Sequence, residues 1–425
     1  MPTTSTEGAT LAASAGVTAG RGTHAVGSGM VTRFLAASGI SFYGDWLTTV
    51  ALVVLLFRIT GSATGPALYI LVRVAPRVLG PVPGGVFADR MGPVRITVAC
   101  ATAQGALTAA IALFAHYRVV PLIYVAVASA QFLNSLAQPA YGALIPRLAP
   151  KERLGQVNGI YSSLFASSIL VSPAIGALVL PHVTPELLII ADAASFLIAA
   201  ALLASLHPAE PQEPDLHSAR GIGAGVPIVL RDGMLRSLAF GYLANTAVIT
   251  ALQAVLVVAA SQHFGRDIDV GWLYAAVGAG GLVGAVPVIR RTPLHVGRVG
   301  IVVATLAELI PVVLFVAVTN LVIAMLLLFI SSLAGTIYQT RGWVGLQQRV
   351  APDLLGRTTA VIRLSMYVGM LFGAVAAVTM VQALGWQATV LIVSAVCFVL
   401  LVSSSVYGPG DRPAEQLAPI DWPPL

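Results

Sequence analysis

Charged residues are scarce in this chain. Asp, Glu, Lys and Arg make up 9% of its 425 residues, hydrophobic residues make up 57%, and the mean hydropathy is +0.89. A soluble globular domain needs a much larger share of polar surface. The composition therefore excludes a soluble globule and predicts a protein that crosses a membrane many times.

Cysteines and catalytic clusters are also scarce. The chain has two cysteines, Cys100 and Cys397, and both fall inside apolar runs, so neither a disulfide framework nor a zinc site is indicated. There is no His/Asp/Glu cluster, no nucleophile with a base at helical spacing and no phosphate-binding glycine loop. We therefore expect neither an enzyme nor a protein that holds a metal or another cofactor.

The net charge of +6 does not indicate a nucleic-acid partner, because the basic residues occur singly at the ends of apolar runs. Residues 1–30 are rich in Ser, Thr, Ala and Gly and lack the charged flank and apolar core of a signal peptide, so they predict a disordered tail. At roughly 20 apolar residues per crossing, the remainder holds twelve runs that are expected to be helices. These runs are 34–57, 66–88, 95–115, 119–144, 156–180, 186–206, 237–262, 270–289, 298–318, 320–342, 357–384 and 387–407.

The basic residues predict the orientation in the membrane. Thirteen lie in alternate loops, namely Arg90, Arg95, Arg147, Lys151, Arg153, Arg220, Arg231, Arg236, Arg290, Arg291, Arg298, Arg349 and Arg357. The opposite loops hold Arg58, Arg118 and Arg266. Because cytoplasmic loops are enriched in Lys and Arg, we expect both termini in the cytoplasm and the protein in the inner (plasma) membrane.

The polar stretch 207–236 divides the runs into two sets of six and is expected to be a cytoplasmic linker. The predicted domains are thus a bundle over 31–206 and a second over 237–407, with cytoplasmic tails at 1–30 and 408–425. A short repeat supports this division, since the Arg-x-Ala-Pro of 147–150 recurs at 349–352. The fold class is an all-α membrane protein of two six-helix bundles.

The loop at 84–95 carries a charged, glycine-rich pattern made by Gly85, Asp89, Arg90, Gly92 and Arg95. It resembles the loop between helices 2 and 3 of the major facilitator superfamily, whose members transport solutes. The resemblance implies two bundles with the substrate site between them near the midplane of the membrane. We expect Gly85 to allow close helix packing, Gly92 to adopt a positive φ and Asp89 to lie at a helix N-terminus as part of a gate.

Residues 42–69 and 139–159 look like the subfamily that contains enterobactin exporters and macrolide-efflux proteins. In the fifth run, Ser168, Ser172, Pro173 and Gly176 resemble the antiporter motif, with serine or alanine at three of its glycine positions. The loop at 84–95 departs from the usual superfamily pattern, because Val94 replaces one of two adjacent basic residues. None of these stretches identifies a substrate.

Charged residues inside the membrane are candidates for proton coupling, because each one is costly unless it faces a cavity or a partner. Asp45 and Arg77 share a depth, and Arg73 lies one turn further out. An Asp45–Arg77 or Asp45–Arg73 pair is therefore predicted, either as a static ion pair or as a pair that exchanges a proton during transport. Glu308 is expected to be either a second proton carrier or a carboxyl that is neutral or faces lipid. Asp192 is expected to have an interfacial or helix-start role.

Neutral polar residues are the candidates for substrate contacts. Gln131, Asn134 and Gln138 share one face of the fourth run, and Asn245 and Gln253 lie in the seventh. Such residues either line the cavity or hold helices together. Tyr69, Trp272 and Tyr274 are expected to anchor helices at the membrane interface.

The leading function is a proton-coupled exporter of a small amphipathic molecule, such as a drug, an antibiotic or a siderophore, that works by alternating access. The alternatives are a facilitator or importer of a polar solute and a lipid translocator. We expect no cofactor beyond the proton gradient. The expected partners are the substrate and the bilayer, and we expect a monomer.

Overall fold

The computed structural model describes residues 20–80, 83–84, 87, 90–150, 153–207, 226–290, 298–350 and 352–406. Over these ranges the chain forms helices and short turns and no β-strand. The first bundle contains α1 (Gly20–Thr60), α2 (Thr64–Val74), α3 (Pro76–Leu79), α5 (Pro93–His116), α6 (Val120–Leu148), α7 (Leu154–Val179) and α8 (Pro185–Ala204).

The second bundle contains α10 (Gly233–His263), α11 (Val270–Arg290), α12 (Arg298–Phe315), α13 (Leu321–Arg349) and α14 (Pro352–Val406). The short helix α9 (Val226–Arg231) precedes it, and the 3-10 turn η4 (Asp267–Asp269) joins α10 to α11. The long helix α14 is two helices that meet at Gly385, where φ is 79°. Counting α2 and α3 as one crossing and α14 as two, the described residues make the twelve predicted crossings.

The helix boundaries follow the apolar runs closely, with two differences. The second run is interrupted, because α2 ends at Val74 and α3 begins at Pro76, where proline lacks the N–H that a continuous helix needs. The first helix begins at Gly20, inside the predicted disordered tail. Residues 1–19, the linker residues 208–225 and the tail 408–425 lie outside the described residues.

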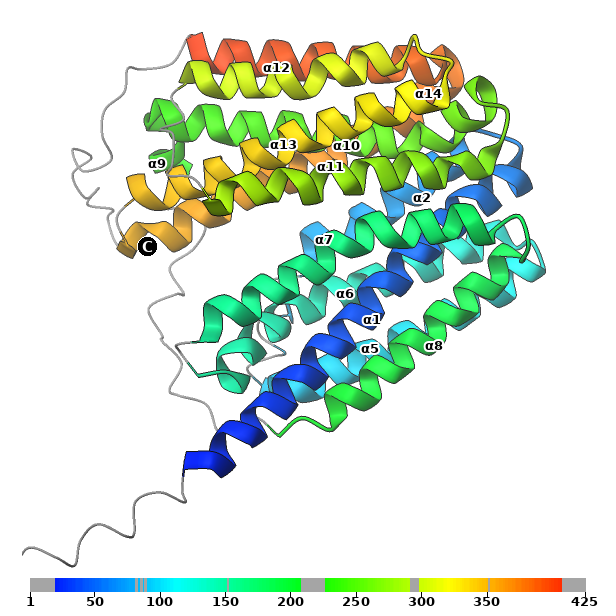
Figure 1. Ribbon diagram of the computed structural model, residues 1–425. Helices are drawn as coiled ribbons and strands as arrows, with labels where there is room; N and C mark the ends of the chain where they lie inside the picture. Colours follow the sequence, from blue (N-terminus) through cyan, green and yellow to red (C-terminus); the bar gives the residue numbers. More distant parts are fainter. Residues whose placement is uncertain are drawn as a thin grey trace, which may run out of the picture.

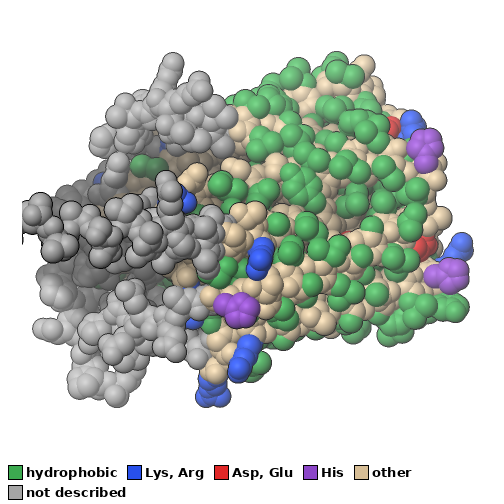
Figure 2. Space-filling model, turned by 60° about the horizontal axis from the view of Figure 1, so that its bottom comes forward, with side chains coloured by type: hydrophobic (Ala, Val, Ile, Leu, Met, Phe, Trp, Pro, Cys, Tyr) green, Lys and Arg blue, Asp and Glu red, His purple; other side chains and the backbone are tan. Residues whose placement is uncertain are grey.

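Apolar side chains face outward along the helices. On α8, Leu187, Ile190 and Leu197 are about half exposed, whereas Ile189 and Phe196 on the opposite face are buried. Figure 2 shows hydrophobic side chains over most of one face of the molecule, with basic and histidine side chains gathered toward its two ends. This distribution matches a protein whose flank contacts lipid and whose ends contact water.

The two bundles lie side by side, and α1 begins and α14 ends at the same end of the molecule (Figure 1). We name this the tail end, and we name the end that holds the turn at 61–63 the far end. Gly271 of α11 lies against the backbone of Pro173 of α7, and Gly278 lies against the backbone of Leu170. These contacts join the far halves of the two helices, so the bundles meet toward the far end.

Candidate functional site

An ion pair between α1 and α2 forms the centre of the candidate site. The Nη2 atom of Arg73 lies 2.6 Å from Oδ2 of Asp45. The side chain of Asp45 is 22% exposed and that of Arg73 is 7% exposed. The guanidinium of Arg73 also lies over the ring of Trp46, at 5.0 Å from its centroid, where the face of the ring attracts a cation. Of the two predicted pairs, the structure forms Asp45–Arg73.

The predicted polar face of α6 reaches this ion pair. Gln131 donates from Nε2 to Oδ1 of Asp45 at 3.4 Å, and its Oε1 accepts a hydrogen bond from Nη2 of Arg77 at 3.3 Å. Asn134 and Gln138 bond to each other on the tail-end side of Gln131. The stripe on α6 therefore continues from the ion pair toward the tail end, and Arg77 joins the site through Gln131 instead of through Asp45.

Aromatic residues close the far-end side of the site. Trp46 packs edge-on against Tyr274 of α11, with ring centroids 6.2 Å apart. Tyr274 is buried and donates to the backbone oxygen of Gln253 at 2.9 Å, and Tyr69 is buried as well. The prediction that Tyr69 and Tyr274 anchor helices at the membrane interface is wrong, because both rings lie in the packed interior.

A second polar cluster lies inside the second bundle. Glu308 of α12 is 2% exposed and accepts a hydrogen bond from Nδ2 of Asn245 of α10. Oδ1 of Asn245 in turn accepts from Nε2 of Gln339 of α13 at 3.2 Å. Glu308 therefore points into the bundle, and the lipid-facing alternative is wrong. Asn245 is 1% exposed, which favours the second of its two predicted roles, that of holding helices together.

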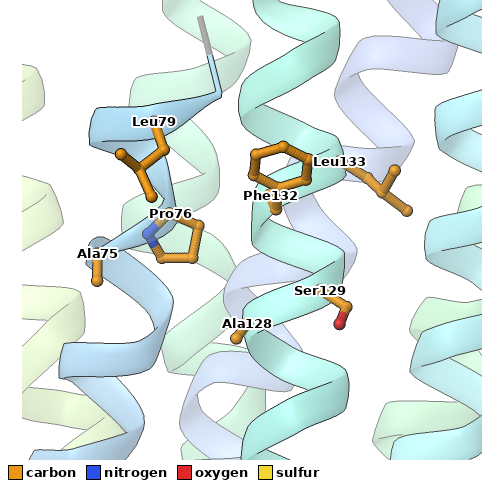
Figure 3. Close-up of a pocket in the computed structure, with 7 residues that line it drawn as sticks. All are labelled: Ala75, Pro76, Leu79, Ala128, Ser129, Phe132 and Leu133. Carbon is orange, nitrogen blue, oxygen red and sulfur yellow. The ribbon is translucent and has the colours of Figure 1, made fainter. Parts of the chain in front are cut away.

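An apolar pocket lies beside the first cluster, where the break between α2 and α3 faces α6 (Figure 3). Its volume is about 490 Å³, and its lining residues are Ala75, Pro76, Leu79, Ala128, Ser129, Phe132 and Leu133. Arg77 and Gln131 belong to the same two segments, but neither lines the pocket. The pocket itself therefore offers a ligand a mainly apolar surface.

Comparison with known proteins identifies the family. A family model described as the Major Facilitator Superfamily matches residues 34–361. The chain belongs to the major facilitator superfamily. It is a transporter with several membrane-spanning helices and is not an enzyme.

Curated relatives and solved structures agree with this assignment. The chain is 26% identical over 383 residues to the multidrug efflux pump Tap of Mycobacterium tuberculosis, covering 84% of this chain and 88% of that protein. The protein of the same name from Mycolicibacterium fortuitum is 24% identical over 366 residues, covering 83% and 89%. A bacterial homologue of the human lysosomal transporter Spinster, solved in an inward-facing and unoccupied conformation, matches with a TM-score of 0.70 at 14% identity, covering 88% and 95%. That structural likeness concerns the fold alone.

The superfamily loop between helices 2 and 3 is described in part. Gly92 has a φ of 82° and precedes α5, as predicted, and Arg90 and Arg95 are exposed. A Cβ atom on Gly84 would meet the backbone of Leu136 of α6, so Gly84 makes a close helix approach. Gly85 and Asp89 lie outside the described residues, and their predicted roles stay predictions.

The antiporter-like motif on α7 is a packing surface between helices. Ser172 donates to the backbone oxygen of Tyr43 at 2.8 Å, and Ser168 donates within its own helix to Phe165 at 2.7 Å. Gly176 packs against Val50 of α1. The same stretch meets α11 of the other bundle through Pro173, so this part of the transporter joins α1 to the bundle interface.

Three features of the transporter were missed in the sequence. Asp192 of α8 is buried, with Ser195 donating to its Oδ1 at 3.0 Å, so the prediction of an interfacial role is wrong. Asp232 is buried, and its carboxylate accepts hydrogen bonds from the backbone N–H groups of Met234 and Leu235 at the start of α10. It also forms an ion pair with Arg349, at 2.7 Å.

The third missed feature is an ion pair between the bundles at the far end. The Nε and Nη2 atoms of Arg58 lie 2.5 and 2.9 Å from the two carboxylate oxygens of Asp267. The two residues are 209 positions apart, so no local pattern relates them. Only an aspartate just before a helix, as at Asp232, carries a local signal, because aspartate is a preferred N-cap residue.

Proposed function

We propose that this transporter is a proton-coupled exporter of a small amphipathic molecule and that it works by alternating access in the inner (plasma) membrane. The observation that carries the proposal is the Asp45–Arg73 ion pair, which lies between helices of the first bundle and remains partly exposed. A charge at this depth is costly unless it has a partner and a use.

We place the tail end in the cytoplasm, because most basic residues of the loops lie there. The bundles meet toward the far end, which is then the outer side. Asp45 and the polar face of α6 are therefore reached from the cytoplasm in this conformation. In this proposal, the conformation described here is the one that takes up the substrate.

Coupling requires a group that binds a proton in one conformation and releases it in the other. Asp45 gains or loses its ion pair when Arg73 moves, and loss of a cationic neighbour changes the proton affinity of a carboxylate. A proton from outside would neutralise Asp45 and free Arg73 and Gln131, and its release on the inner side would restore the arrangement seen here. Arg77 and Glu308 complete the predicted proton-coupling set.

The substrate class follows from the surfaces beside the ion pair. The pocket between α2, α3 and α6 supplies apolar contacts, and Gln131, Asn134 and Gln138 supply amide groups. Relatives named as multidrug efflux pumps favour export of a drug-like molecule over uptake of a polar solute.

The test uses the purified full-length protein in vesicles with an imposed proton gradient and ethidium as an amphipathic probe. Asp45→Asn keeps the shape of the side chain and removes its charge. We expect it to abolish uphill dye movement while downhill exchange continues, and we expect Glu308→Gln to do less. Glu186→Gln is the matched control, because Glu186 lies in the first turn of α8 at the far end.

Uphill transport by Asp45→Asn vesicles would refute the role of Asp45. Dye movement by the native protein that ignores the proton gradient would indicate a facilitator. Native vesicles that move no dye, compared with empty vesicles, would refute drug export.

A further inference from the structure

Asp192 is a buried carboxyl that the proposed coupling does not use. It lies on α8, is 2% exposed, and accepts a hydrogen bond from Ser195 in the next turn of its own helix. In the described part of the structure it forms no ion pair. A buried carboxylate without a cation is unstable relative to the neutral acid. This arrangement therefore suits a protonated Asp192.

Asp192 lies at the level of the Asp45–Arg73 pair. A Cβ atom on Gly44 of α1 would collide with the carboxyl of Asp192 and the hydroxyl of Ser195, so the carboxyl rests on the backbone next to Asp45. Asp45 and Arg73 are the charged neighbours of Asp192.

The other groups that face Asp192 are few. Tyr69 of α2 lies close enough to interact with it electrostatically. The second helix packed against α8 is α5, which has no acidic or basic residue between Arg95 and His116 at its two ends. Arg73 is thus the cationic neighbour of both Asp45 and Asp192.

One N–H group of Arg73 is not used in a hydrogen bond. Its Nη2 bonds to Asp45, whereas its Nε is buried and has no hydrogen-bond partner in the described residues. The buried hydroxyl of Thr48 already lies against the carboxyl of Asp192. The site therefore holds an unused N–H of Arg73 and a hydroxyl beside Asp192, which are donors that a charged Asp192 would need.

We infer that Asp192 is a second proton-binding carboxyl and that Arg73 is shared between Asp45 and Asp192. In the structure seen here Arg73 pairs with a charged Asp45 while Asp192 holds the proton. In the other arrangement the O–H bond of Asp192 breaks and its proton is released to the inner side, a proton from outside is bound at Asp45, and Arg73 pairs with the charged Asp192.

The trio keeps the same total charge in both arrangements. Each one contains one guanidinium, one carboxylate and one neutral carboxyl, so no uncompensated charge is buried when the arginine moves. The inference rests on the proposed function, because it gives the transported proton a second binding site, at Asp192.

The test is infrared difference spectroscopy of the purified full-length protein, which detects the C=O stretch of protonated buried carboxyls. Asp192→Asn should remove one such band. Asp45→Asn should remove the same band at the same pH although Asp192 is intact, because Arg73 is then free to pair with it. Glu186→Gln is the control and should leave the band unchanged.

The two results should also appear as a shift in titration. Between the native protein and Asp45→Asn, the midpoint of the Asp192 band should move by at least about one pH unit, a tenfold change in proton affinity. If Asp192 only holds helices together, its replacement would lower thermal stability and Asp45→Asn would leave its band in place. That outcome would overturn the inference.

Ser195→Ala is a second variant that keeps the carboxyl and removes one hydrogen bond to it. It should shift the frequency of the band, and an unmoved band would contradict its assignment to Asp192. The spectra need neither a substrate nor a gradient. If the native protein fails to couple transport to protons, the proposed export is refuted. The titration of the Asp192 band can still be measured, so the two failures are distinguishable.

Discussion

Breaking the ion pair between Arg58 and Asp267 should open the far end of the transporter. The pair joins α1 of the first bundle to η4 of the second through two hydrogen bonds, of 2.5 and 2.9 Å. A state that is open at the far end separates these groups, so the pair stabilises only the conformation seen here. Arg58→Ala or Asp267→Asn should therefore raise the population of the state that is open at the far end.

The size of the effect follows from exposure. The side chains of Arg58 and Asp267 are 46% and 19% exposed, and exposed pairs contribute about 0.2–1 kcal/mol. The two parallel bonds place this pair toward the upper end of that range. A change of about 1 kcal/mol alters the ratio of the two states roughly fivefold.

The assay is the rate at which a membrane-impermeant maleimide, added from outside, labels Ala177→Cys. Ala177 is buried, and Gly271 of the other bundle lies against it, so it becomes accessible only when the far end opens. The background replaces Cys100 and Cys397 by alanine. Labelling should rise up to about fivefold in either single variant, and less in high salt, which screens exposed charges.

Two controls separate the ion pair from a general change in charge. Arg118→Ala removes a basic residue at the same end for which the described residues show no ion pair, and it should leave labelling unchanged. The double variant Arg58→Asp with Asp267→Arg should restore slow labelling. Equal labelling of the native protein and both single variants would refute the reasoning.

Two further predictions concern stability, measured as the melting temperature of the protein in detergent. Asp232→Ala removes the N-cap of α10 and the partner of Arg349, and should cost roughly 1–3 kcal/mol; an unchanged melting temperature would contradict this. Gly84→Ala places a Cβ atom against the backbone of Leu136 and should lower the melting temperature, whereas Gly155→Ala has no atom within 4 Å of the new Cβ and should not. Equal effects would show that the close approach at Gly84 has no energetic weight.

The twelve crossings were predictable because each helix needs a long apolar run, and the runs are separated by short polar turns. Departures from that pattern occur where local chemistry intervenes. Pro76 interrupts an apolar run that is continuous in the sequence, and two helices meet directly at Gly385, where the backbone is not helical. The early start of α1 at Gly20 has no apolar signal.

The sequence predicts how deep in the membrane the site residues lie, but not which of them contact one another. Counting residues along α1 and α2 places Asp45, Arg73 and Arg77 near one another, yet the choice of Arg73 depends on the rotation of α2 before the break at Pro76. From the sequence alone Asn245 and Glu308 have separate expected roles, because nothing in it relates α10 to α12. Their hydrogen bond appears only when the helices pack.

The turns at the far end make each pair of helices a tethered unit. The connections there, at 61–63, 117–119, 180–184, 264–269, 316–320 and Gly385, hold no more than six residues each, and each one joins helices of the same bundle. A turn of three residues spans at most about 11 Å, so paired helices separate little at that end. Opening between the bundles stretches none of these tethers, and its energy there depends on the contacts between the bundles alone.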